Sequence, residues 1–174
     1  MVQERKGIIK YSGMEQTVVG GDIQVGQKAP NFTIQKNDWT ISKGLKETKR
    51  KVRIILSVSS LDTDVCDRET RRFNEEAGRL GKGIAILVVS MDLPVAQKRW
   101  CGAAGAEHVI TVSDTIKTDF GKKYGTLMKE VRLLRRAVFI VNKKGIVTYV
   151  AYMPANGDEP NYEEVLAAAK AALG

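Results

Sequence analysis

Cysteine, histidine and long apolar runs are scarce in this 174-residue chain, and each scarcity excludes a class of protein. The two cysteines are too few for a disulfide framework, and with one histidine and no C-x-x-C pair they do not make a conventional zinc site. No apolar run approaches the roughly 18 residues of a membrane-spanning helix. The two thiols therefore form a structural pair, lie inert in the core, or act as a nucleophile and its partner.

The length allows one compact domain with a full hydrophobic core. No linker, repeat or low-complexity segment divides the chain. We therefore expect a single domain over residues 1–174, with residues 1–24 as an N-terminal hairpin extension. The first ten residues are charged and lack the apolar stretch of a secretory signal, so we expect a cytoplasmic protein with no membrane partner.

The net charge of +8 raises the question of nucleic-acid binding. No stacking aromatic residues are interleaved with the main basic group, and no helix-turn-helix or zinc-finger spacing is present. We therefore expect a solvated loop and face, with weak attraction to polyanions and no specific nucleic-acid partner. The basic residues fall into two groups: Lys43, Lys46, Lys49, Arg50, Lys51 and Arg53, and then Arg132, Arg135 and Arg136.

Strand-like and helix-like segments alternate along the chain. This alternation, closed by a hairpin and a helix, predicts an α/β fold of thioredoxin-like topology, with a central mixed sheet flanked by helices and an N-terminal β-hairpin. Residues 39–51 are polar and basic and are expected to be mostly loop. Strands are expected at 7–11, 16–20, 31–35, 52–58, 84–91, 109–112, 137–141 and 146–152, and helices at 68–80, 94–100, 116–124 and 160–173.

Cys66 stands between a buried strand and a helix, in the run LDTDVCD. In a thioredoxin-like topology this is the carboxyl end of a central strand, where open α/β sheets place their sites. A thiol in the first turn of a helix faces free backbone N–H groups and the positive end of the helix dipole. Both favour the thiolate, which is the nucleophilic form. An inert buried thiol is the ordinary expectation for a cysteine, but this position favours a nucleophile.

Two other residues are candidates for the same site. Thr63 precedes Cys66 by three positions, and its hydroxyl either turns toward the thiolate or serves as a helix N-cap or turn residue. Arg136 leads into the apolar run AVFIV, and it either extends to solvent at the sheet edge or points into a site. An arginine beside a thiolate would favour the charged sulfur and polarise a peroxide O–O bond. The sequence leaves both pairs of alternatives open.

Three segments, in the same order, resemble the thiol peroxidases, a branch of the peroxiredoxins. The run SLDTDVCDRETRRFNEEA resembles their peroxidatic segment, and MDLPVAQKRWCGAAG resembles their resolving-cysteine segment. The run LLRRAVFIVNKKGIV resembles their arginine-bearing strand and the hairpin after it. With the N-terminal hairpin and the closing EPNYEEVLAAAKAAL, the resemblance covers nearly the whole chain. T-x-x-C alone is a weak signal, whereas the DLP-x-AQ-x-R-x-CG run is specific.

The resemblance implies a thiol-dependent peroxidase that reduces hydrogen peroxide and alkyl hydroperoxides. Cys66 would become a sulfenic acid, while Thr63 and Arg136 would position the peroxide and the thiolate. Cys101 would resolve the sulfenic acid by forming an intramolecular Cys66–Cys101 disulfide, which thioredoxin would reduce. The resemblance also implies no bound cofactor or metal, a homodimer, and no catalytic role for His108.

Two positions depart from the family pattern. Ser59 stands where peroxiredoxins usually have the proline that packs over the reactive cysteine and shields it from water. The substitution predicts a more flexible loop and a more open pocket, hence a slower, less selective or even inactive site. Ala104 stands where the family often has glutamate, which we treat as a minor change.

The two cysteines are separated by 34 residues and are expected on separate helices. A disulfide needs Cα atoms within roughly 7 Å of each other. We therefore expect the segments around Cys66 and Cys101 to unwind locally when the protein is oxidised. The sulfenic acid must be captured before it is over-oxidised, so this rearrangement is part of the expected chemistry.

Two other functions fit the same sequence. One is a peroxide-sensing or chaperone-like redox protein on the same fold, in which the disulfide is a signal and turnover is low. The other is a basic binding module whose cysteines are inert. Turnover coupled to thioredoxin separates the enzyme from the sensor, and reaction of either thiol with peroxide excludes the binding module.

Overall fold

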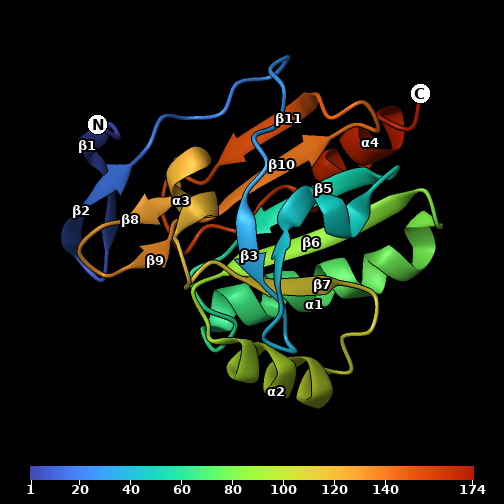
Figure 1. The fold of residues 1–174 in the computed structure, drawn as a ribbon, viewed down its shortest axis with the longest axis horizontal. Helices are drawn as coiled ribbons and strands as arrows, with labels where there is room; N and C mark the ends of the chain where they lie inside the picture. The colour runs from blue at the N-terminus through green and yellow to red at the C-terminus, as the bar shows by residue number, and fades with distance from the viewer.

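The computed structural model describes all residues 1–174 and builds the chain around two β-sheets (Figure 1). The larger sheet has seven strands in the order β11-β10-β5-β6-β7-β3-β4, and the smaller one has four in the order β1-β2-β8-β9. The strands are β1 (Glu4–Tyr11), β2 (Met14–Val19), β3 (Thr33–Gln35), β4 (Ile41–Lys43), β5 (Val52–Ser57), β6 (Ile84–Ser90), β7 (Ile110–Ser113), β8 (Leu127–Met128), β9 (Leu133–Leu134), β10 (Ala137–Val141) and β11 (Val147–Tyr152). The helices are α1 (Asp64–Leu80), α2 (Pro94–Ala104), α3 (Asp119–Lys123) and α4 (Tyr162–Ala171), with a 3-10 helix η1 (Gly44–Thr48).

The large sheet is mixed. Strands β5, β6 and β7 run parallel, whereas β10 pairs antiparallel with β5 and with β11. Every residue of β5 and β6 is buried, as expected of central strands that are covered on both faces. The predicted α/β fold, with a central mixed sheet flanked by helices and an N-terminal hairpin, is confirmed.

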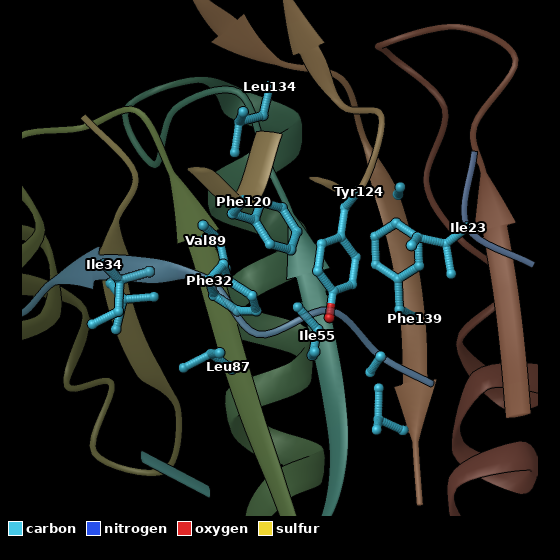
Figure 2. Close-up of a cluster of buried hydrophobic side chains, with 14 of the residues drawn as sticks. Ile23, Phe32, Ile34, Ile55, Leu87, Val89, Phe120, Tyr124, Leu134 and Phe139 are labelled. Atoms are coloured by element: carbon cyan, nitrogen blue, oxygen red, sulfur yellow. The ribbon is translucent and has the colours of Figure 1, made fainter. Parts of the chain in front are cut away.

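Alternate side chains of the central strands point to opposite faces of the sheet and pack into two separate hydrophobic cores. On one face, Ile55, Leu87 and Phe139 pack against a group of aromatic rings (Figure 2). Phe120 lies at the centre of this group, with ring centroids 4.9 Å from Phe32 and 4.6 Å from Tyr124. In Figure 2 these side chains lie in front of the strands and a helix lies behind them.

The second core fills the other face of the large sheet. There, side chains from β5, β6 and β10 meet Phe73 of α1, Trp100 of α2 and Val165 of α4. Cys66 belongs to this core and is fully buried, and Cys101 packs against its margin. Both cysteines thus lie on the helix-covered face.

The N-terminal hairpin is confirmed, and it belongs to the small sheet at the end of the molecule that carries the N-terminus (Figure 1). Strand β2 also pairs with β8, which the sequence did not predict. Gly20, just after β2, packs closely against the rest of the protein. A Cβ at this position would lie 1.9 Å from the Lys122 carbonyl oxygen, and its backbone has a positive φ of +92°. Only glycine is suited to this position.

Two predictions about irregular segments are wrong. Residues 39–51 are not mostly loop, because β4 pairs with β3 and η1 follows directly. The expected helix 116–124 is shortened to Asp119–Lys123. Thr118 adopts a left-handed conformation (φ 50°), and the Asp114 carboxylate accepts the backbone N–H groups of Phe120 and Gly121. A side chain that takes these donors begins the helix later than hydrophobic spacing suggests.

The basic residues are less exposed than we expected. Arg53, Arg135 and Arg136 are buried, with exposed fractions of 6%, 3% and 1%. Arg53 donates to the Thr48 hydroxyl and to the Leu45 carbonyl, and so holds η1 against the sheet. The prediction that both basic groups form a solvated face is therefore wrong for Arg53 and Arg135, while the burial of Arg136 agrees with the second of its two predicted alternatives. No helix has the length and apolar character needed to cross a bilayer.

We predict that Phe120→Ala lowers the free energy of unfolding by about 3–5 kcal/mol, because a large ring is removed from a close-packed core. Urea unfolding followed by circular dichroism measures the change. Ile116→Ala is the matched control, since Ile116 precedes the same helix and is 41% exposed. Equal losses in the two variants would contradict this account of the core.

Candidate active site

Cys66 occupies the first turn of α1, as predicted, just beyond the end of β5. Helix α1 begins at Asp64, four residues earlier than the hydrophobic spacing indicated. The Cys66 thiol is fully buried. A sulfur in this place lies near the free N–H groups and the positive end of the helix.

Arg136 meets Cys66 because of the strand order. Strand β10 runs antiparallel to β5, with Ala137 opposite Ser57, so the residue before β10 lies beside the end of β5. The Arg136 Nη2 group lies 3.3 Å from Cys66 Sγ and donates to it. The guanidinium therefore points inward toward the thiol, not outward to solvent at the sheet edge.

Glu69 and Asn156 complete the surroundings of Arg136. The Arg136 Nη1 group donates to a Glu69 carboxylate oxygen, and both side chains are fully buried. The Asn156 carbonyl oxygen accepts from Arg136 Nη2 at 2.9 Å and from Nε at 3.2 Å. Neither residue was expected at the site from the sequence. For Glu69 a signal existed, because it follows Cys66 by three positions and therefore shares its helix face.

Burial shapes the charges of this group. It raises the pKa of Glu69 to about 7, although the neighbouring Arg136 charge acts in the opposite direction. Burial alone would lower the pKa of Arg136, but the charges of Glu69 and Cys66 outweigh it and hold that pKa above its ordinary value. Arg136 therefore remains a cation, and two acidic groups share it.

Thr63 precedes α1 at the N-cap position, but its hydroxyl does not cap the helix. The hydroxyl donates to the Ser60 carbonyl oxygen at 2.8 Å, which makes it a turn residue in this structure. Thr63 and Arg136 nevertheless line the same cavity. This cavity of about 340 Å³ is bounded by Thr63, Asp64, Val65 and Arg136, by Lys10, Tyr11 and Ser12 of the hairpin, and by Ala155, Asn156 and Gly157. The cavity thus shares Arg136 with the group around Cys66.

Cys101 lies on α2, half-buried, and both cysteines are free thiols. Its sulfur is 3.3 Å from the Thr111 hydroxyl, which also bonds to Asn37. The helices that carry the two cysteines are joined beside them, because Trp100 Nε1 donates to Asp67 at 2.7 Å. The structure thus places the cysteines on separate helices that share one core, as predicted.

Ser59 does not lie loosely over the site. Its side chain is fully buried, and its hydroxyl donates to the Leu134 carbonyl oxygen at 2.7 Å. The Asn156 side-chain amide donates to the same hydroxyl at 2.9 Å. The loop that contains Ser59 therefore has polar anchors that a proline cannot provide.

Other positions named from the sequence lie outside this group. His108 is exposed just before β7, and its backbone N–H donates to Asn74. Ala104 is half-buried at the end of α2. No cluster of three or more histidine, cysteine, aspartate or glutamate side chains is arranged to hold a metal ion.

Known proteins are similar to this chain in sequence and in fold. A model of the Redoxin family matches residues 24–166. The thiol peroxidase of Halalkalibacterium halodurans is 50% identical over 165 residues, which cover 95% of this chain and 98% of that protein. The thiol peroxidase of Bacillus subtilis is 45% identical over 163 residues, which cover 94% and 96%.

Solved structures of peroxiredoxin-like and thiol peroxidase proteins have a fold similar to that of this chain. A peroxiredoxin-like protein from Aquifex aeolicus matches with a TM-score of 0.86 at 37% identity and covers 99% of both chains. The thiol peroxidase from Chromobacterium violaceum matches with a TM-score of 0.79 at 21% identity and covers 90% of this chain and 91% of its own. These likenesses confirm the predicted thioredoxin-like fold.

We predict that Glu69 makes the folded state less stable as the pH rises from about 4.5 to about 7. Across this range the unfolded chain has lost the Glu69 proton while the folded chain retains it. The folded state then binds more protons, so the free energy of unfolding falls with rising pH. The fall contributes about 1.4 kcal/mol for each unit by which the pKa is raised.

Urea unfolding of the wild type and of Glu69→Gln between pH 4.5 and pH 8 tests this. The glutamine variant should show a flatter dependence of stability on pH. It should not be flat, because burial also raises the pKa of Asp114 to about 7. Parallel curves for the two proteins would show that Glu69 titrates in its ordinary range.

Proposed function

The chain belongs to the thiol peroxidases of the Redoxin family, and we propose that Cys66 is the residue that reduces the peroxide. The observation that carries this proposal is the 3.3 Å contact between Cys66 Sγ and Arg136 Nη2. It joins a sulfur at a helix start to a buried cation that also lines a cavity.

The proposed first step is attack of the Cys66 thiolate on one oxygen of a hydroperoxide. An S–O bond forms as the O–O bond breaks, and the sulfur is oxidised to a sulfenic acid. The departing oxygen takes a proton and leaves as water or an alcohol. Arg136 favours the thiolate before the attack and stabilises the negative charge on the departing oxygen during it.

We propose that Thr63 holds the peroxide from the other side. Thr63 lines the same cavity as Arg136, and a hydroxyl can donate and accept at once. In the free protein that hydroxyl is bonded to Ser60. Binding of a peroxide would therefore require the Thr63 hydroxyl to exchange or share this partner.

Cys101 is the proposed resolving residue. Its thiol condenses with the Cys66 sulfenic acid, releasing water and leaving a Cys66–Cys101 disulfide. A dithiol reductant, which we propose to be thioredoxin, then supplies the two electrons that restore both thiols. Hydrogen peroxide and alkyl hydroperoxides are the proposed substrates, as the resemblance to thiol peroxidases implies.

Three expectations about the whole molecule remain proposals. We propose that residues 1–174 act as one domain, which the pairing of β2 with β8 supports. We also propose a cytoplasmic location and a homodimer, both of which rest on the family resemblance. Sedimentation of the purified protein tests the homodimer.

We predict different losses for the two cysteine variants. Cys66→Ser should lose all reaction with hydrogen peroxide, because no other thiol contacts Arg136. Cys101→Ser should still consume one equivalent of peroxide but lose turnover with thioredoxin, thioredoxin reductase and NADPH. NADPH oxidation measures turnover, and a peroxide assay measures the first equivalent.

These variants also separate the alternatives. If Cys66→Ser keeps full activity, the proposed mechanism is wrong. If the wild type consumes peroxide stoichiometrically but does not turn over with thioredoxin, the protein is a sensor or chaperone-like redox protein. If neither thiol reacts with peroxide, both cysteines are inert.

We predict that oxidation loosens the start of α1 and the whole of α2. The bond between Trp100 and Asp67, and the ion pair of Arg99 with Asp62 at 2.8 Å, must open for the cysteines to approach. Hydrogen exchange followed by mass spectrometry should show lower protection of both segments in the oxidised protein. Strands β5 and β6 are the internal control, and matching protection of α1 and α2 in both forms would contradict the prediction.

A further inference from the structure

A chain of hydrogen bonds leads from Ser59 to the guanidinium beside Cys66. The Ser59 hydroxyl donates to Leu134 and accepts from the side-chain amide of Asn156. The backbone carbonyl of the same Asn156 accepts two hydrogen bonds from Arg136. Asn156 therefore connects the segment before α1 to the arginine of the site.

The geometry of the Arg136 guanidinium means that its bonds to Asn156 also determine how it meets Cys66. The Arg136 Nη2 group has two hydrogens, and it donates to the Asn156 carbonyl at 2.9 Å and to Cys66 Sγ at 3.3 Å. The guanidinium is a rigid plane whose N–H groups point in fixed directions. When Nε–H and one Nη2–H both bond to the Asn156 carbonyl, the direction of the second Nη2–H is therefore also fixed. That other hydrogen points at the sulfur.

The carbonyl that performs this task lies in an exposed loop. Pro154, Ala155 and Gly157 are exposed around the half-buried Asn156. The bonds between Ala155 and Asp158 are internal to the loop and do not fix it to the sheet. The Met153 backbone N–H ties the start of the loop to the Arg136 carbonyl at 3.1 Å. Beyond that point, the Asn156 side chain is bonded to a buried group, the Ser59 hydroxyl.

We propose that Ser59 and Asn156 are positioning residues, which hold the 153–158 loop so that Arg136 is aimed at the Cys66 sulfur. This proposal rests on the proposed roles of Cys66 and Arg136. Neither positioning residue touches the sulfur, and Ser59 acts through Asn156. The serine that stands in place of the family's proline thus provides the anchor for Asn156. A proline could not do so, because it has no hydroxyl to donate to Leu134 or to accept from Asn156.

The proposal is tested in a Cys101→Ser background, where Cys66 reacts without forming the disulfide. Ser59→Ala, Asn156→Ala and the double variant are compared with this parent. Two quantities are measured: the pH midpoint of Cys66 alkylation by iodoacetamide, and the second-order rate constant for its oxidation by hydrogen peroxide. The first reports the charge state of the thiol and needs no peroxide chemistry.

Each single substitution should raise the alkylation midpoint and slow oxidation by about tenfold, since small misplacements of a catalytic group are costly. The double variant should be no slower than Asn156→Ala alone, because residues that act in series are not additive. Ser57→Ala is the matched control. Ser57 is also fully buried and its hydroxyl donates to the Arg135 carbonyl at 2.9 Å, but it has no bond to Asn156.

The control should lose stability to a similar degree as Ser59→Ala while keeping the parent's midpoint and oxidation rate. If Ser59→Ala and Asn156→Ala also keep both values within twofold, the bonds are only structural and the proposal is wrong. Asn156→Ala remains informative if Ser59→Ala does not fold, because Asn156 lies in a surface loop. If the parent alkylates but never reacts with peroxide, the proposed function fails, and the alkylation midpoints still decide the positioning role.

Discussion

The site depends on the burial of one guanidinium. Arg136 is 1% exposed, and a charge removed from water is tolerated only where partners replace its hydration. Those partners come from separate parts of the chain: Cys66 and Glu69 from α1, and Asn156 from the loop after β11. Satisfying one cation therefore fixes the start of a helix, the start of a strand and a surface loop relative to one another. The reactive sulfur is positioned as a consequence of this requirement.

The same cation faces two acidic groups, and burial decides how they share it. With Glu69 and Cys66 both ionised, the buried group would carry a net negative charge, which a low-dielectric interior disfavours. Burial raises the pKa of Glu69 to about 7 even though the charge of Arg136 acts in the opposite direction. A protonated Glu69 leaves the full charge of Arg136 facing the sulfur.

Sequence patterns predicted the features that depend on local chemistry. The buried strands, both hairpins and the place of Cys66 at a helix start follow from apolar runs and turn residues that lie together in the chain. They did not predict that Arg53 and Arg135 are buried, because basic side chains are ordinarily solvated and the carbonyl, hydroxyl and carboxylate acceptors of these two are brought to them only by the fold. Asn156 was also missed, because it meets Arg136 through a backbone oxygen and its side chain meets Ser59 97 positions away in sequence. The shortened α3 was missed because Asp114 competes for helix N–H groups in a way that hydrophobic spacing does not show.

The architecture also separates what must stay rigid from what must move. Around Arg136 the contacts are buried and charged. Breaking one of them would leave a buried charge without its partner, which costs much free energy. Between α1 and α2 the joining contacts are of another kind: Arg99 and Asp62 are each more than half exposed, and Arg71 only stacks over Trp100 at 5.6 Å. Exposed ion pairs contribute about 0–1 kcal/mol, so the hydrogen bond of the buried Trp100 to Asp67 is the stronger of the contacts that hold α2 beside α1. None of these contacts involves Arg136, so α2 can open without breaking the Arg136 group. The proposed mechanism needs this separation, because the Cys66 sulfur must be held for the attack and then be reached by the Cys101 thiol.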